Sequence, residues 1–142
     1  MPDKIEDLWP DINPAAIVTP ASILKTQAAA LSQKSKGLLQ GEVETWAYEQ
    51  NIYHRFSLVV PALENYRYSL LRVHHLPTVY PVYIDESPLP VIEGESTDWN
   101  SAAGQTTYSL QDEASFRGWL RKALAATETK RILESLLAQA SS

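Results

Sequence analysis

The sequence contains no cysteine, few glycines and no long apolar run, and each absence excludes a class of protein. Without cysteine, the 142 residues offer no disulfide, no thiol nucleophile and no cysteine-ligated zinc or iron–sulfur site. The five glycines form neither a GxGxxG fingerprint nor a Walker A loop. No apolar run reaches the roughly 18 residues that a membrane span needs, and residues 1–14 lack the features of a secretory signal. We therefore expect a cytoplasmic protein with no cofactor and no membrane contact.

Basic charge is also scarce. The chain carries 17 acidic and 12 basic residues, which gives a net charge of -5. Five of the acids lie between Asp85 and Tyr108, a segment without Lys or Arg, so the rest of the chain is balanced. Because phosphate contacts dominate the affinity of proteins for nucleic acids, this layout argues against a nucleic-acid partner.

The apolar pattern predicts a single α+β domain over residues 1–142. A segment at 1–18 precedes a predicted helix at 19–36, in which Thr19 is typical of an N-cap, Pro20 of the first helical position and Gly37 of the residue after the end. The pattern changes to a period of two between residues 39 and 84, which is typical of β-strands.

This β region predicts an antiparallel meander of four strands, at 39–48, 52–60, 66–75 and 78–84. Pro81 places the fourth strand at an edge, because proline cannot donate a hydrogen bond to a neighbouring strand. Residues 85–108 are predicted as an acidic loop with room for a short fifth strand. Two helices follow over 109–140, starting at Ser109 and after Thr127, and we expect the helices to cover mainly one face of the sheet.

The second of the three predicted helices carries two further features. Glu113, Arg117 and Arg121 follow one another at intervals of four, which is typical of a solvent-exposed row of ion pairs. Gly118 lies in the middle of the same helix, and we expect another backbone to approach closely there.

The alternation in the first two strands determines which side chains share a face. Pairing Tyr48 with Tyr53 places Val43 opposite Leu58 on the side of the helices. The other face then carries Trp46, Tyr48, Tyr53 and Arg55, joined by Tyr66, Tyr68 and Arg72 if the third strand has the matching register. Exposed Trp, Tyr and Arg are the residue types that anchor protein interfaces. The alternative is that another part of the chain covers this face.

These observations favour a non-enzymatic, protein-binding accessory domain, such as an adaptor, an immunity-type inhibitor or a chaperone-like module. We expect Trp46, Tyr48, Tyr53, Arg55, Tyr66 and Tyr68 to form its contact surface. The partner is another protein or a second copy of the chain, bound through this face or through the edge strand.

A small enzyme with a dispersed site is the first alternative. Its candidate residues are His54, the strand carboxylates Glu42 and Glu44, and Arg72. A metal site would need His54 beside His74 or His75, together with Asp85 or Glu86. The spacing is not diagnostic, so we assign neither catalytic residues nor metal ligands.

The second alternative is an RNA-binding module. The α-β-β-β-α order resembles that of a double-stranded-RNA-binding domain, and Arg121-Lys122-Ala123 would lie on its basic helix. The charge layout argues against it.

Overall fold

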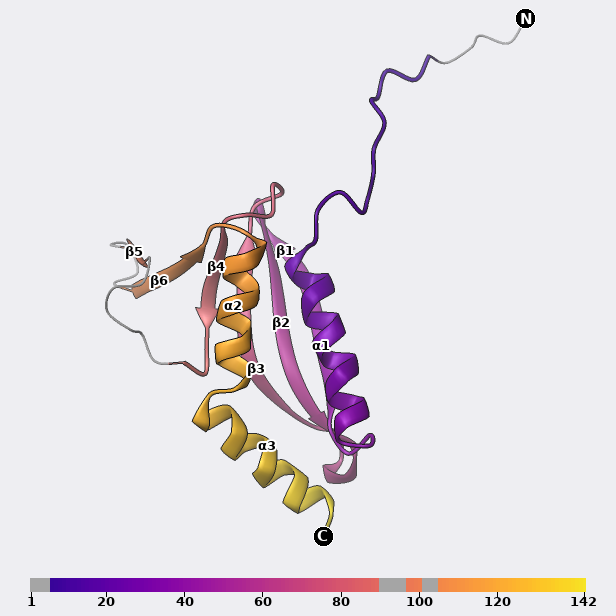
Figure 1. Cartoon of the computed structure of the whole chain (residues 1–142), viewed down its shortest axis with the longest axis vertical. Helices are drawn as coiled ribbons and strands as arrows, with labels where there is room; N and C mark the ends of the chain where they lie inside the picture. Colours follow the sequence, from indigo (N-terminus) through magenta and orange to yellow (C-terminus); the bar gives the residue numbers. More distant parts are fainter. Residues whose placement is uncertain (1–5, 90–96, 101–104) are drawn as a thin grey trace, which may run out of the picture.

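The computed structural model describes residues 6–89, 97–100 and 105–142, in which helices cover one face of an antiparallel sheet (Figure 1). The elements are α1 (Pro20–Lys34), β1 (Gln40–Tyr48), β2 (Asn51–Val60), a short 3-10 turn (Pro61–Leu63), β3 (Tyr66–His75), β4 (Val82–Glu86), β5 (Thr97–Asn100), β6 (Gln105–Leu110), α2 (Glu113–Leu124) and α3 (Thr127–Ala140). Within the described ranges the strand order is β1-β2-β3-β4-β6-β5. The α+β fold class predicted from the sequence is confirmed.

Helix α1 begins and ends where its sequence indicates. The Thr19 hydroxyl accepts a hydrogen bond from the Ser22 amide at 3.2 Å, and Pro20 is the first helical residue. After the helix, Gly37 adopts a positive φ of 82° and donates its amide hydrogen to the Ser32 carbonyl. The chain then turns directly into β1, so α1 and β1 lie antiparallel and in contact (Figure 1).

The β1–β2 hairpin is tighter than predicted. Tyr48 pairs with Asn51, which leaves a turn of two residues, and Val43 lies opposite Phe56. The predicted pairing of Tyr48 with Tyr53 is therefore wrong by two residues. A shift of two keeps every side chain on its expected face, so Val43 and Phe56 still point toward the helices.

Strand β4 is not an edge strand, which corrects the prediction based on Pro81. It begins at Val82, after the proline, and pairs with β3 on one side and β6 on the other. Strand β5 and most of β6 lie within the segment 85–108 predicted as an acidic loop, of which residues 90–96 and 101–104 are outside the described ranges. Helix α2 correspondingly starts later than the predicted Ser109, because β6 continues to Leu110 and Asp112 caps the helix.

The hydrophobic core lies between the sheet and the helices α1 and α2, with α3 closing its lower end (Figure 1). Its fully buried large side chains include Leu24 of α1, Phe56 of β2, Leu71 of β3 and Phe116 of α2. One sheet face packed against helices excludes water from this apolar set.

Two features of α2 can be compared with the sequence. The Glu113 carboxylate accepts a hydrogen bond from Arg117 Nε at 2.7 Å, as the interval of four indicates. The expected close approach at Gly118 is wrong, since a Cβ at this position would meet no described atom within 4 Å. No helix of the described residues is both long enough and apolar enough to cross a bilayer.

Candidate functional site

Four rings line up across the face of the sheet that points away from α1 and α2, hereafter the outer face. Trp46, Tyr53, His74 and Tyr83 are direct neighbours on β1, β2, β3 and β4. Consecutive ring centroids are 5.5, 5.1 and 5.1 Å apart, within the range of favourable aromatic pairs. We call this set the aromatic row. Each ring limits the motion of the next, so the row presents a preorganised surface of Trp, Tyr and His.

A second tier, of charged side chains, lies beside the aromatic row. Arg55 and Arg72 are opposite each other on β2 and β3. The Arg55 guanidinium lies 5.1 Å from the centroid of the Trp46 ring, a cation–π geometry. Arg72 donates toward Glu86 at 3.2 Å, whereas within the described part of the chain Arg55 forms no ion pair. Arg55 is therefore the cation of this face whose charge is left for another molecule.

A third group, also of charged side chains, lies on the outer face beyond Arg55 and Arg72. Arg67 on β3 contacts Glu42 at 2.7 Å and Glu44 at 3.0 Å, both on β1. The hydrogen bond and the charge of Glu42 raise the pKa of Arg67. Glu44 is also the cross-strand neighbour of Arg55, but both carboxylates accept hydrogen bonds from Arg67. Their pairing with Arg67 makes them members of an exposed ion-pair network rather than two free carboxylates for acid–base chemistry.

His74 is held in one orientation by Asp85. Its Nδ1 lies 2.9 and 2.8 Å from the two carboxylate oxygens of Asp85. Both side chains are mostly covered, with 20% and 17% of their surface exposed. This contact holds the His74 ring in place between Tyr53 and Tyr83, so Asp85 stabilises the aromatic row.

Tyr66 and Tyr68 do not belong to the outer face, which corrects the predicted contact surface. Their partners on β2 are Val60 and Leu58, whose side chains point toward the helices. A β-bulge between Phe56 and Ser57 changes the register of β3, so that Arg72 reaches the outer face while both tyrosines do not.

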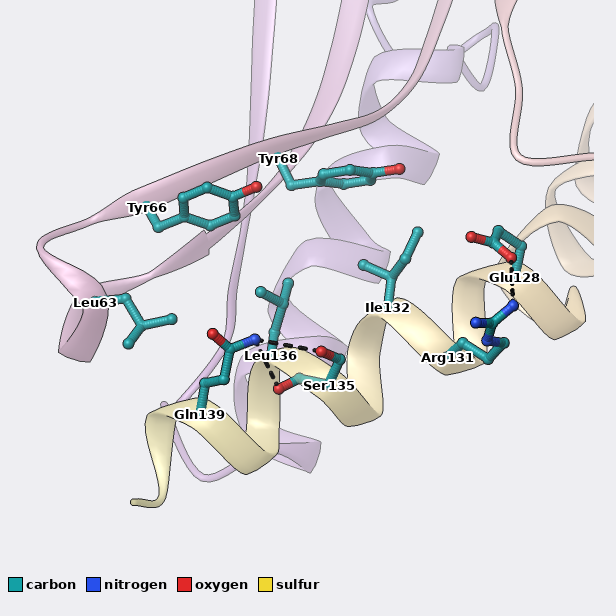
Figure 2. A pocket seen from close by; sticks show the side chains of 9 residues that line it. All are labelled: Leu63, Tyr66, Tyr68, Glu128, Arg131, Ile132, Ser135, Leu136 and Gln139. Atoms are coloured by element: carbon teal, nitrogen blue, oxygen red, sulfur yellow. Dashed lines mark hydrogen bonds and ion pairs between the residues drawn. The ribbon is translucent and has the colours of Figure 1, made fainter.

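The two tyrosines instead line a cavity of about 690 Å³ against α3 (Figure 2). Figure 2 shows both rings lying above Ile132 and Leu136 of α3, with Leu63 at one end. Glu128 and Arg131, an exposed pair 3.4 Å apart, lie at the other end. The charges of this cavity therefore cancel.

His54 lies on the opposite side from His74, in the core. Its Nε2 is 2.8 Å from Nε2 of His75, and its Nδ1 is 2.9 Å from the Thr45 hydroxyl. Burial, followed by the neighbouring His75 and by Lys25, lowers the pKa of His54 to about 4. Asp85 contacts His74 on the other face, so two histidines and a carboxylate do not meet. Among the residues described, no group of three or more ligating side chains is placed to hold a metal ion.

Of the six side chains expected to form the contact surface, the structure brings Trp46, Tyr53 and Arg55 together. Tyr48 is on the same strand as Trp46, but at the hairpin end, where 65% of it is exposed. Sequence reasoning missed His74, Tyr83 and Asp85 as members of this face. The signal was weak because both faces of β3 are apolar in part and because the bulges at β2–β3 and β3–β4 are not encoded in the period of two.

Comparison with known proteins gave no match to any family model, any curated protein or any solved structure. What can be inferred about function therefore comes from this chain's own residues.

Proposed function

We propose that this chain is a non-enzymatic, protein-binding domain and that the outer face of its sheet is the contact surface. The observation that carries the proposal is the aromatic row, which continues over four strands and ends at Trp46 under the Arg55 guanidinium. Trp, Tyr and Arg are the residues that most often carry the binding energy of protein interfaces.

The position of the helices supports this assignment. Helices α1 and α2 both lie on the other face of the sheet (Figure 1). An aromatic surface that is preorganised before binding loses little conformational entropy when a partner arrives. The ion pairs of Arg67 and of Arg72 surround it as the polar rim that is typical of an interface.

Arg55 indicates the chemistry of the partner. Arg67 and Arg72 are both neutralised by carboxylates of this chain, and Arg55 is not, within the residues described. A partner carboxylate would pair with Arg55 while an apolar or aromatic side chain beside it covers Trp46 and Tyr53. The surface therefore fits a protein segment that presents an acidic residue next to an apolar one.

A capture experiment with matched variants tests the proposal. The immobilised chain is incubated with a cell extract, and bound proteins are compared between wild type, Trp46→Ala, Arg55→Ala and Tyr66→Ala. We expect the first two variants to lose a protein that the wild type retains. The affinity of that protein, once purified, should fall by about fivefold or more in calorimetry, because truncating an interface anchor costs more than about 1 kcal/mol.

Tyr66→Ala is the control, since Tyr66 is an exposed aromatic residue on the other side of the sheet. It should bind like the wild type. Thermal unfolding of each variant checks that the sheet is intact. Retention of the same proteins by a folded Trp46→Ala, Arg55→Ala double variant would refute the outer face as the contact surface.

A further inference from the structure

Residues 6–18, hereafter the arm, expose an unusual amount of apolar surface. Leu8, Trp9, Ile12 and Ile17 are 82, 76, 74 and 52% exposed. Single exposed apolar residues are ordinary, but large ones gathered in a short segment mark an interaction site. The arm also carries three acidic residues, Glu6, Asp7 and Asp11, and no Lys or Arg. It is therefore an acidic segment with apolar anchors.

The arm is directed away from its own body. It leaves the fold at the start of α1 and projects beyond the sheet (Figure 1). Its base is fixed there, because the Tyr80 hydroxyl donates a hydrogen bond to the Val18 carbonyl at 2.9 Å and Thr19 caps α1. The hydrogen bonds that the described arm residues donate are local, from Trp9 to Asp7 and from Ala15 and Ala16 to Asn13.

A groove with basic side chains at its rim, in contrast to the acidic arm, runs between α1 and α2. Two cavities of about 470 and 230 Å³ share Gln27, Lys34 and Leu124, so they lie next to each other along α1. The floor is apolar and consists of the half-buried Leu31, Leu124 and Leu133, beneath which Phe56, Leu58 and Leu70 of the core are 2, 1 and 5% exposed. The rim carries Lys34, Arg117 and Arg121, and none of the described residues that line it is acidic. We call the two cavities together the α1–α2 groove.

Charge distinguishes this groove from the other two surfaces. The cavity under Tyr66 and Tyr68 is lined by one acid and one base. On the outer face Glu42, Glu44 and Glu86 are paired with Arg67 and Arg72, so within the described residues only Arg55 is left for a partner carboxylate, against the three acids of the arm. The α1–α2 groove keeps a positive rim even after Glu113 is counted against Arg117.

We propose that the arm of one chain docks in the α1–α2 groove of a second copy, whose own arm docks in return. Leu8, Trp9 and Ile12 cover the apolar floor, while Asp7 and Asp11 lie beside Lys34 and Arg121. The exchange is reciprocal, so it closes as a two-fold dimer and leaves no free arm.

The dimensions of the two parts agree. The α1 wall from Ile23 to Lys34 is about 16 Å long at 1.5 Å per residue. The stretch from Leu8 to Ile12 spans about 14 Å when extended. The anchors of the arm can therefore occupy the groove along its length without bending the chain.

The association state of the full chain is the first test. Sedimentation over a wide concentration range should show a dimer for the wild type and a monomer for Trp9→Ala, Ile12→Ala, with a dissociation constant roughly a hundredfold or more higher. Ala15→Ser, a change in the arm that removes no large apolar group, is the matched control and should remain dimeric. A wild type that sediments as a monomer throughout would overturn the proposal.

Charge exchange tests which surface receives the arm. The reversals Lys34→Glu and Arg121→Glu should weaken the dimer, and Asp7→Lys with Asp11→Lys should do the same. A chain that carries all four changes should regain a dimer, because both sets of charges are again opposite. Failure of the four-fold variant to recover, while it is folded by circular dichroism, would overturn the groove as the docking site.

Engineered cysteines decide between exchange and docking within one chain. Since the sequence contains no cysteine, a thiol crosslinker reacts only at introduced positions. An Asn13→Cys chain mixed with a Gln27→Cys chain should form a covalent heterodimer, whereas Asn13→Cys mixed with Ala62→Cys should not. If the double variant Asn13→Cys, Gln27→Cys crosslinks only within a single chain, the arm docks on its own groove and a second copy is excluded.

Discussion

At the scale of single residues, the core contains a chain of hydrogen bonds whose proton positions follow from the geometry. The Leu76 carbonyl can only accept, so Nδ1 of His75 at 2.7 Å carries a hydrogen. Nε2 of His75 then accepts from Nε2 of His54, and Nδ1 of His54 accepts from the Thr45 hydroxyl. A proton added at Nδ1 of His54 would require the Thr45 hydroxyl to turn and accept, and the buried cation would face His75 and Lys25.

The hydrogen bonds around His54 predict that the protein loses stability in acid. The pKa of His54 is lowered from 6.5 to about 4 in the folded state, so between these values the unfolded state binds more protons. The free energy of unfolding should therefore fall as the pH decreases from about 6.5 to 4, by about 3 kcal/mol from this group alone. Urea unfolding at a series of pH values measures the change.

The variant His54→Gln isolates this effect, because the amide can still donate to His75 but takes up no proton. Its stability at neutral pH can differ from that of the wild type. Its decrease toward pH 4 should be smaller than that of the wild type by about the same 3 kcal/mol. An identical pH dependence in the two proteins would show that His54 is not the titrating group.

At the scale of elements, the contact of α1 with β1 depends on one glycine. A Cβ built on Gly41 would lie 2.6 Å from Ala28 Cα and 2.7 Å from Ala28 Cβ. No real side chain tolerates a backbone atom at that distance, so α1 must move away if any other residue replaces Gly41. Gly41 therefore allows the backbone of α1 to lie against β1 at Ala28.

Replacing glycine by alanine should therefore have opposite effects on stability at positions 41 and 118. Gly41→Ala should lower the free energy of unfolding by roughly 1–3 kcal/mol, as overpacking in a core does. Gly118→Ala should raise it by about 0.5–1 kcal/mol, because the space is open and alanine favours the helix more than glycine does. Denaturant titrations of both variants give the values. A destabilised Gly118→Ala or an unaffected Gly41→Ala would contradict this packing.

Elements with their own local signals were predictable from the sequence. Thr19, Pro20 and Gly37 mark α1, and the alternation in β1 and β2 assigns their faces, because these signals depend only on neighbours in the chain. The register of β3 and the positions of β5 and β6 depend on bulges and on partners distant in sequence. That is why Trp46, Tyr53 and Arg55 were found together, while His74, Tyr83 and Asp85 were missed and Tyr66 and Tyr68 were misplaced.

At the scale of the whole molecule, the two proposed contact surfaces lie on opposite sides of one sheet. The aromatic row lies on the outer face, and the α1–α2 groove lies among the helices. The core between them is a layer of close-packed side chains such as Phe56 and Leu71. A dimer formed through the arms therefore leaves both copies of the outer face accessible, so that one assembly presents the contact surface twice.

This arrangement predicts that dimer formation through the arms and partner binding at the outer face are independent of each other. Sites that share no partner and lie more than about 7–10 Å apart usually add within about 0.5 kcal/mol. Trp46→Ala should leave the dissociation constant of the dimer within about twofold in sedimentation, and monomeric Trp9→Ala, Ile12→Ala should still retain the partner captured by the outer face. The weaker apparent affinity of the monomer on a surface coated with that partner would reflect only the loss of bivalent attachment. Loss of the dimer in Trp46→Ala would instead place the second copy on the outer face, since no contact of Trp46 reaches the groove.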